Sequence, residues 1–250
     1  MKKQNLRMNA NFFFASALTF LATISAAAID FSKADAMFAK AEDLTGCRSV
    51  LIEQLPQASS DKEKAEVLWR LARVQVLIGE DETSKEGKRR EFSKGISYAE
   101  KAIEADPQNH WGYMWHSANV GRECQTHPLM EQAKAVPVML EDLDTILKTL
   151  GRTGCGEAWQ ALAEIYYNHP FKSNDEALKY ARNAVTYTPA GEVRTCAKTL
   201  LAKILYAKKQ KDEARNVALK AKSEYEALPC PTPYQQKEYR ELLEVIENIK

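Results

Sequence analysis

A stripe of aromatic, basic and amide side chains recurs at three-and-four spacing in four segments of the chain. Residues with this spacing share one face of a helix, and Trp, Tyr and Arg carry a disproportionate share of the binding energy at protein interfaces. We therefore interpret the stripe as a surface that anchors a peptide or protein. The candidate binding residues of the stripe are Trp69, Arg73, Trp115, Asn119, Arg122, Gln160, Glu164, Tyr167, Lys203 and Tyr206. Val76 and Thr199 have the same spacing and complete the stripe.

Two features of this stripe are open from the sequence alone. Trp and Tyr at helical spacing are also typical of a hydrophobic core, so Trp69 and Trp115 fit a packed interior as well as a binding surface. A register shifted by one residue turns Met114 and Ala118 toward the same surface and weakens the assignments beside them.

The chain lacks the motifs that catalysis and metal binding need. The glycine-rich residues 151–156 fit neither a dinucleotide fingerprint nor a phosphate-binding loop. The four histidines form no His-Glu-x-x-His motif, the cysteines form no Cys-x-x-Cys pair, and no Gly-x-Ser-x-Gly elbow is present. We predict a protein that is not an enzyme and that has no cofactor and no metal site.

The five cysteines bear on a possible disulfide. Cys155, Cys196 and Cys230 are predicted to lie near the starts of the first helices of three successive helix pairs, at one end of the fold. Since Cys196 can bond to only one neighbour, the candidate pairs are Cys155 with Cys196 and Cys196 with Cys230. Free buried thiols are the alternative.

The charge of the chain excludes one class of function. Its 35 basic residues nearly balance its 34 acidic residues, so it has no general positive field with which to bind nucleic acid. A local run of basic residues over 85–94 is interrupted by acidic ones. We expect this run to form a solvated turn, with contact to an acidic partner as the alternative.

Residues 1–28 have the pattern of a secretory signal peptide. Lys2, Lys3 and Arg7 precede an apolar run over 12–22, and three alanines follow at 26–28. The run is about half of the ~20 residues that a membrane-spanning helix needs. No cysteine stands where a lipoprotein would carry lipid. We expect an exported, periplasmic protein that is soluble after cleavage.

The rest of the chain has the periodicity of helices. Apolar residues recur every 3.6 positions without sustained alternation, which predicts an all-α fold. Small residues also recur at fixed distances, as in tetratricopeptide repeats: Leu201-Ala202 is followed by Ala214, Ala218 and Ala221. Antiparallel helices approach closely where one presents Ala or Gly to a bulky residue of the other. We predict an α-solenoid of stacked antiparallel helix pairs with a C-terminal capping helix.

Along the whole sequence we expect four parts. The signal peptide over 1–28 is followed by an N-terminal hairpin over 29–60, four tetratricopeptide-like repeats over 61–228 and the capping helix over 229–250. The second repeat is degenerate, and Pro137 is expected to open or kink its second helix.

Several segments resemble the T component of tripartite ATP-independent periplasmic (TRAP) transporters. They are LWRLAR at 68–73, KGISYAEKAIEADP at 94–107, and shorter matches at 112–122, 136–137 and 162–166. The resemblance implies a helical repeat protein that associates with the periplasmic solute-binding subunit of such a transporter. Some members of that family are lipoproteins that trimerise around a pore, whereas this sequence lacks the lipid-acceptor cysteine. The stretch at 69–73 is also similar to eukaryotic regulators of microtubule dynamics.

Two functional hypotheses follow. The first is an exported adaptor whose concave groove binds a partner protein, with the solute-binding subunit of a TRAP-type transporter as the candidate. The alternative is a periplasmic carrier that encloses a small apolar or organic-acid ligand, with Trp115 and Tyr167 as walls and Arg122 as counter-charge. The sequence leaves the oligomeric state open, a homo-oligomer included.

Overall fold

A computed structural model describes residues 28–168, 172–189, 192 and 194–249. Residues 1–27, which carry nearly all of the predicted signal peptide, lie outside this part of the chain. The described residues form helices and no strand, which confirms the all-α prediction. In chain order the helices are α1 (Ser32–Lys40), α2 (Leu44–Gln54), the 3-10 turn η1 (Leu55–Gln57), α3 (Asp61–Asp81), α4 (Lys85–Ala105), α5 (His110–Cys124), α6 (Leu129–Gln132), α7 (Ala135–Leu150), α8 (Gly156–Asn168), α9 (Asn174–Thr186), α10 (Thr195–Ala207), α11 (Lys211–Glu226) and α12 (Pro233–Ile249).

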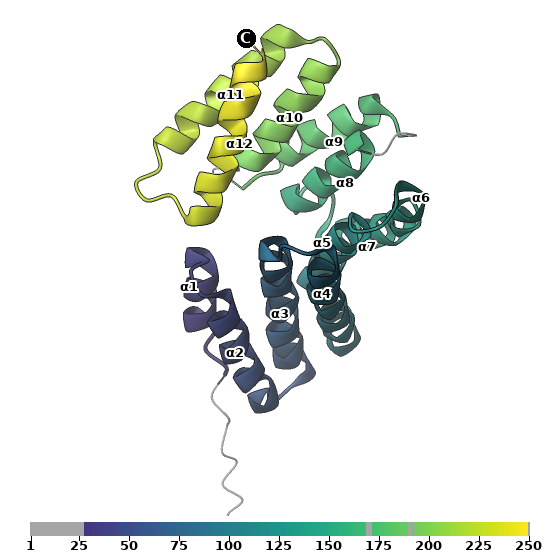
Figure 1. The fold of residues 1–250 in the computed structure, drawn as a ribbon, viewed down its shortest axis with the longest axis vertical. Helices are drawn as coiled ribbons and strands as arrows, with labels where there is room; N and C mark the ends of the chain where they lie inside the picture. The colour runs from purple at the N-terminus through teal and green to yellow at the C-terminus, as the bar shows by residue number, and fades with distance from the viewer. Residues whose placement is uncertain (1–27, 169–171, 190–191, 193, 250) are drawn as a thin grey trace, which may run out of the picture.

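The helices pack as successive pairs that follow a curve (Figure 1). The pairs are α1 with α2, α3 with α4, α5 with α7, α8 with α9 and α10 with α11, and α12 covers both α10 and α11. The curve brings the two ends of the fold together, because α12 also packs against α1. The concave side is therefore bounded at both ends by terminal helices.

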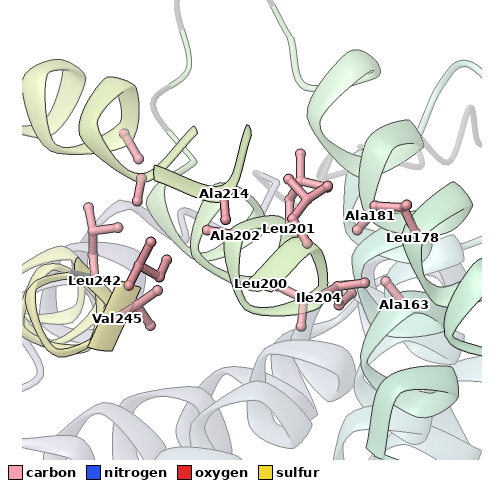
Figure 2. Close-up of a cluster of buried hydrophobic side chains, with 14 of the residues drawn as sticks. Ala163, Leu178, Ala181, Leu200, Leu201, Ala202, Ile204, Ala214, Leu242 and Val245 are labelled. Carbon is pink, nitrogen blue, oxygen red and sulfur yellow. The ribbon is translucent and has the colours of Figure 1, made fainter. Parts of the chain in front are cut away.

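Alanines permit the close approach between these helices. Figure 2 shows Ala163, Ala181, Ala202 and Ala214 among larger side chains of the C-terminal core. All four are 0% exposed, so any larger side chain at these positions would meet the neighbouring helix. Their burial confirms the reason for which small residues were expected at fixed distances.

Short polar side chains start several of the helices. Ser60, Ser84 and Ser173 each accept a hydrogen bond from a backbone N–H in the first turn of α3, α4 and α9, and Asp43 does the same for α2. Each such cap satisfies a donor that the helix itself leaves unpaired.

The basic run over 85–94 is not a solvated turn, and that prediction was wrong. Helix α3 continues to Asp81 and α4 begins at Lys85, so each has 21 residues and the run lies on the first half of α4. Two local contacts explain the longer helices. Ser84 caps α4, and Gly79 leaves room for the ring of Phe92, which a Cβ at that glycine would meet at 2.4 Å.

A buried carboxylate joins α2, α3 and α4. Glu91 is 4% exposed, and its Oε2 accepts hydrogen bonds from Gln75 Nε2 at 3.0 Å and Lys94 Nζ at 3.0 Å. The Nη1 of Arg48 on α2 lies 3.4 Å from the same oxygen, and the Nε of Arg90 lies 3.1 Å from Oε1. Burial would raise the pKa of Glu91, but these donors outweigh it and hold the pKa at about 2.

Glu91 is expected to make folding stability depend on acid. Because its pKa is depressed from 4.5 to about 2, the charged form adds about 3 kcal/mol of stability above pH 4.5, which is lost as the pH falls toward 2. A Glu91→Gln variant should be less stable at pH 7 and should lose less stability between pH 4.5 and pH 2. Urea unfolding across this range checks the prediction, and equal pH slopes for the two proteins would contradict it.

The structure contains neither of the two candidate disulfides, and all five cysteines are free thiols. The Sγ of Cys155 lies 3.5 Å from Glu157 Oε2, and the Sγ of Cys196 lies 3.2 Å from Gln160 Oε1. Cys230 is exposed. The sulfurs of Cys155 and Cys196 thus each face a polar side chain of α8 rather than another sulfur. Burial raises the pKa of the Cys155 thiol to about 11 and that of Cys196 well above its usual value.

Candidate functional site

A cavity of about 750 Å³ opens on the concave side of the solenoid. Helices α1, α3, α5, α6, α7 and α8 all contribute to its wall, so residues from 38 to 168 meet there. Most of the wall is apolar. The apolar lining residues are Phe38, Val76, Leu77, Met114, Trp115, Ala118, Met130, Ala133, Val136, Met139, Ala161 and Ile165.

A smaller cavity of about 310 Å³ continues the first toward the C-terminus. It lies between α8, α10 and α12, and most of its lining residues are charged or polar. We call the two cavities together the groove. The residues that line both are Glu80, Arg122, Gln160, Glu164 and Asn168.

The structure brings most of the predicted binding residues together. The seven that line the groove are Arg73, Trp115, Arg122, Gln160, Glu164, Tyr167 and Lys203. They come from α3, α5, α8 and α10, the first helices of successive pairs. The other three, Trp69, Asn119 and Tyr206, do not line it.

Both readings of the α5 register contribute to the groove. Met114 and Ala118 of the shifted register line the cavity together with Trp115 and Arg122 of the first register. A wide cavity contacts a broad face of the helix, so residues one position apart can both reach it.

Trp69 and Asn119 belong to the core, for two different reasons. The Trp69 ring is 6% exposed and stacks on Trp111 with ring centroids 5.5 Å apart. Asn119 is 0% exposed, and its Nδ2 donates hydrogen bonds to the backbone oxygens of Ala72 at 3.0 Å and Trp115 at 2.7 Å. Asn119 therefore ties α3 to α5 behind the groove wall.

Tyr206 lies outside the groove near the C-terminal end of α10. Its side chain is 37% exposed, and the Nζ of Lys211 sits 5.7 Å from the centre of its ring. The three-residue spacing from Lys203 predicted an inward position, but the last turn of α10 extends past the lining residues.

Arg73 is the basic residue at the N-terminal end of the cavity. Its Nη2 donates to Asp35 Oδ1 at 2.5 Å, and its guanidinium lies 3.9 Å from the centre of the Phe38 ring. Burial lowers the pKa of Arg73, and the carboxylate of Asp35 offsets this only in part. The contacts with α1 hold the side chain in the wall of the cavity.

A three-member ionic contact lies where the two cavities meet. Oε1 of Glu80 on α3 lies 3.0 Å from Arg122 Nη2 on α5. Its Oε2 accepts a hydrogen bond from Lys237 Nζ on α12 at 3.0 Å. We call this contact the clasp, because it joins the N-terminal helices to the capping helix across the groove.

Sequence reasoning missed several residues of the groove. Met130 on α6 and Met139 on α7 line the cavity, but the stripe included no residue of either helix. Met130 is 85% exposed. The clasp joins residues 157 positions apart. A repeat pattern predicts contacts between neighbouring helix pairs only, so it could not predict this long-range contact.

No group of three or more His, Cys, Asp or Glu side chains among the described residues could hold a metal ion. One histidine joins two helices: the Nδ1 of His116 lies 2.8 Å from Asp142 Oδ2 on α7. Burial would lower the pKa of His116, but Asp142 raises it above the usual value. This pair fastens α7 to α5. None of the helices described is long and apolar enough to cross a membrane.

Two similarities to known proteins bear on the fold. Residues 30–147 match the family model described as regulator of microtubule dynamics protein 1-3, which extends the similarity of residues 69–73. The crystal structure of TTC0263, a thermophilic TPR protein of Thermus thermophilus, matches with a TM-score of 0.64 and 15% identity, covering 84% of this chain and 95% of that one. No curated protein gives a significant match. The structural match confirms the predicted tetratricopeptide-like solenoid.

Proposed function

We propose that the protein is a helical-repeat adaptor that binds an apolar segment of a partner protein in its groove. The observation that carries the proposal is the cavity of about 750 Å³ on the concave side, with its largely apolar wall. Soluble proteins seldom expose a large apolar surface unless something covers it.

The side chains of the wall suit a protein segment. Trp115 and Arg122 are residue types that anchor interfaces. Met114, Met130 and Met139 all line the cavity, and unbranched thioether side chains adapt to the shape of a bound surface. No catalytic step is proposed for this groove.

The proposal includes a location and a first partner to test. The pattern of residues 1–28 supports export to the periplasm. The resemblance of several segments to the T component of TRAP transporters makes the solute-binding subunit of such a transporter the first candidate. A homo-oligomer is a further interaction to examine.

A second candidate function is a periplasmic carrier for a small apolar or organic-acid ligand. The favouring observation is that the clasp crosses the groove at one end of the apolar cavity. Trp115 lines that cavity, Tyr167 lines the smaller one and Arg122 lines both. In this case the ligand replaces the partner segment.

Co-purification separates the two functions. We expect the tagged protein, crosslinked in its native cells before purification, to carry a stoichiometric protein partner. Filling the cavity with Ala161→Trp should abolish this capture, because Ala161 lies in the apolar wall. Mass spectrometry of the purified complex identifies the partner. A bound small molecule without any protein would reject the adaptor in favour of the carrier.

A further inference from the structure

We propose that the Arg73 end of the apolar cavity is a subsite for a carboxylate joined to an apolar chain. This inference rests on the proposed function in one respect, namely that the groove is the binding face. It adds the chemical class of the bound group and the residues that bind it.

Two hydrogen-bond donors in the wall of this cavity lack partners. The Nε of Arg73 and the Nε1 of Trp115 are buried, and neither makes a hydrogen bond within the described chain. Buried donors in folded proteins are nearly always paired, so each unpaired donor calls for an explanation. Both residues line the same cavity, and one acceptor group placed there would explain both.

The backbone places these two donors at the same level of the groove. Asn119 links the backbone oxygens of Ala72 and Trp115 through its Nδ2, at 3.0 Å and 2.7 Å. Arg73 follows Ala72 on α3, and Trp115 is itself one of the linked residues on α5. The two residues therefore lie at the same level of adjacent helices, and both line the apolar cavity.

Arg73 has hydrogen-bond donors left for a second carboxylate. Asp35 Oδ1 accepts from Arg73 Nη2, but Asp35 also accepts from the Nε and Nη2 of Arg70, so one carboxylate serves two guanidiniums. The other acid beside Arg70 is Glu66, which accepts from Arg70 Nη1 at 2.6 Å and is not in contact with Arg73. A guanidinium has five donors, and a carboxylate can accept from two donors at once.

The surroundings of the subsite require the rest of the ligand to be apolar. Val76, Leu77 and Met114 continue the wall beyond Arg73 and Trp115. An acid without an apolar chain would leave these side chains uncovered and would gain little by binding. The carboxylate can come from a free organic acid or from an acidic side chain within an apolar partner segment.

Matched small probes test the subsite directly. We expect octanoate to bind to the full protein with one-to-one stoichiometry and about tenfold more tightly than octanol, since only the former offers a charged acceptor pair. Acetate, which has the head group alone, should not bind. Isothermal titration calorimetry measures all three. Equal affinities for octanoate and octanol would overturn the proposal.

Variants identify the residues that bind the carboxylate. Arg73→Lys keeps a positive charge near Asp35 but removes the Nε donor, and it should reduce octanoate affinity to that of octanol without changing octanol binding. Trp115→Phe keeps a ring and removes only the N–H, and it should weaken octanoate alone. Arg122→Met tests the alternative that the basic residue at the other end of the cavity holds the carboxylate. Arg182→Lys, on α9 outside the groove, is the matched control and should leave octanoate binding unchanged. An octanoate preference that survives Arg73→Lys but disappears in Arg122→Met would refute the assignment.

Competition distinguishes this inference from the proposed function. If octanoate displaces the captured partner, a carboxylate of that partner uses the same subsite. If the partner binds and Ala161→Trp blocks it, but no probe prefers the acid, the adaptor stands and the subsite is wrong. If octanoate binds as expected and no partner is captured, the subsite stands and the adaptor is wrong.

Discussion

An Ala118→Trp variant is expected to bind the partner at least about 100-fold more weakly than the natural protein, which corresponds to about 2.7 kcal/mol. Ala118 lines the apolar cavity from α5, one turn from Trp115. An indole at this position fills the space that the partner segment needs. The loss arises from exclusion of the segment, so stability should change by no more than about 0.5 kcal/mol.

Surface binding assays with the co-purified partner measure this affinity, and thermal melts measure the stability of each variant. Ala207→Trp provides the matched control, because Ala207 is an exposed alanine at the end of α10 and does not line the groove. It should bind like the natural protein. Unchanged partner affinity in a folded Ala118→Trp protein would show that the partner binds elsewhere.

Gly95→Ala is expected to destabilise the fold by about 3 kcal/mol, equivalent to a decrease in Tm of about 6–12 °C. A Cβ on this glycine would lie 1.9 Å from Asn119 Oδ1 and 2.4 Å from its Cγ. Asn119 cannot withdraw freely, since its Nδ2 bonds to the backbone of Ala72 and Trp115. The added methyl group must therefore either break these buried hydrogen bonds or separate α4 from α5.

The sign of this effect is diagnostic. Within a helix, alanine is favoured over glycine by about 1 kcal/mol, so an unobstructed site would gain stability. Gly121→Ala serves as the control, because its Cβ would meet only the flexible Met139 sulfur at 3.0 Å. We expect Gly121→Ala to be neutral or slightly stabilising in urea unfolding. A Gly95→Ala protein as stable as the natural one would mean that Asn119 does not hold α3 and α5 together.

The small residues and the helical period predicted the solenoid because both act between neighbouring elements. Ala163, Ala202 and Ala214 are at 0% exposure where the repeat spacing expected them. The same spacing placed Arg73 and Arg122 on the inner face, since residues three and four positions apart share one side of a helix. Local periodicity therefore determined both the fold class and the direction of most of the stripe.

Other features depend on contacts that periodicity does not encode. A tryptophan at helical spacing suits a core or a groove equally. In the structure Trp69 stacks on Trp111 and belongs to the core. The helical spacing predicted Asn119 in the groove, whereas its side chain is buried and bonds to two backbone oxygens. The basic run over 85–94 belongs to helix α4 instead of a turn, because the Ser84 cap favours helix there.

The meeting of the two terminal helices changes how this array can come apart. In an open array each repeat contacts only its neighbours, and a free end can fray without consequence for the other. Here α12 rests on α1, and Lys237 reaches Glu80 from 157 residues away. Within the described residues neither terminal helix stands alone, so loosening one of them removes support from the other. Helices α1 and α12 thus protect each other, and the fold gains a cooperativity that stacking alone does not supply.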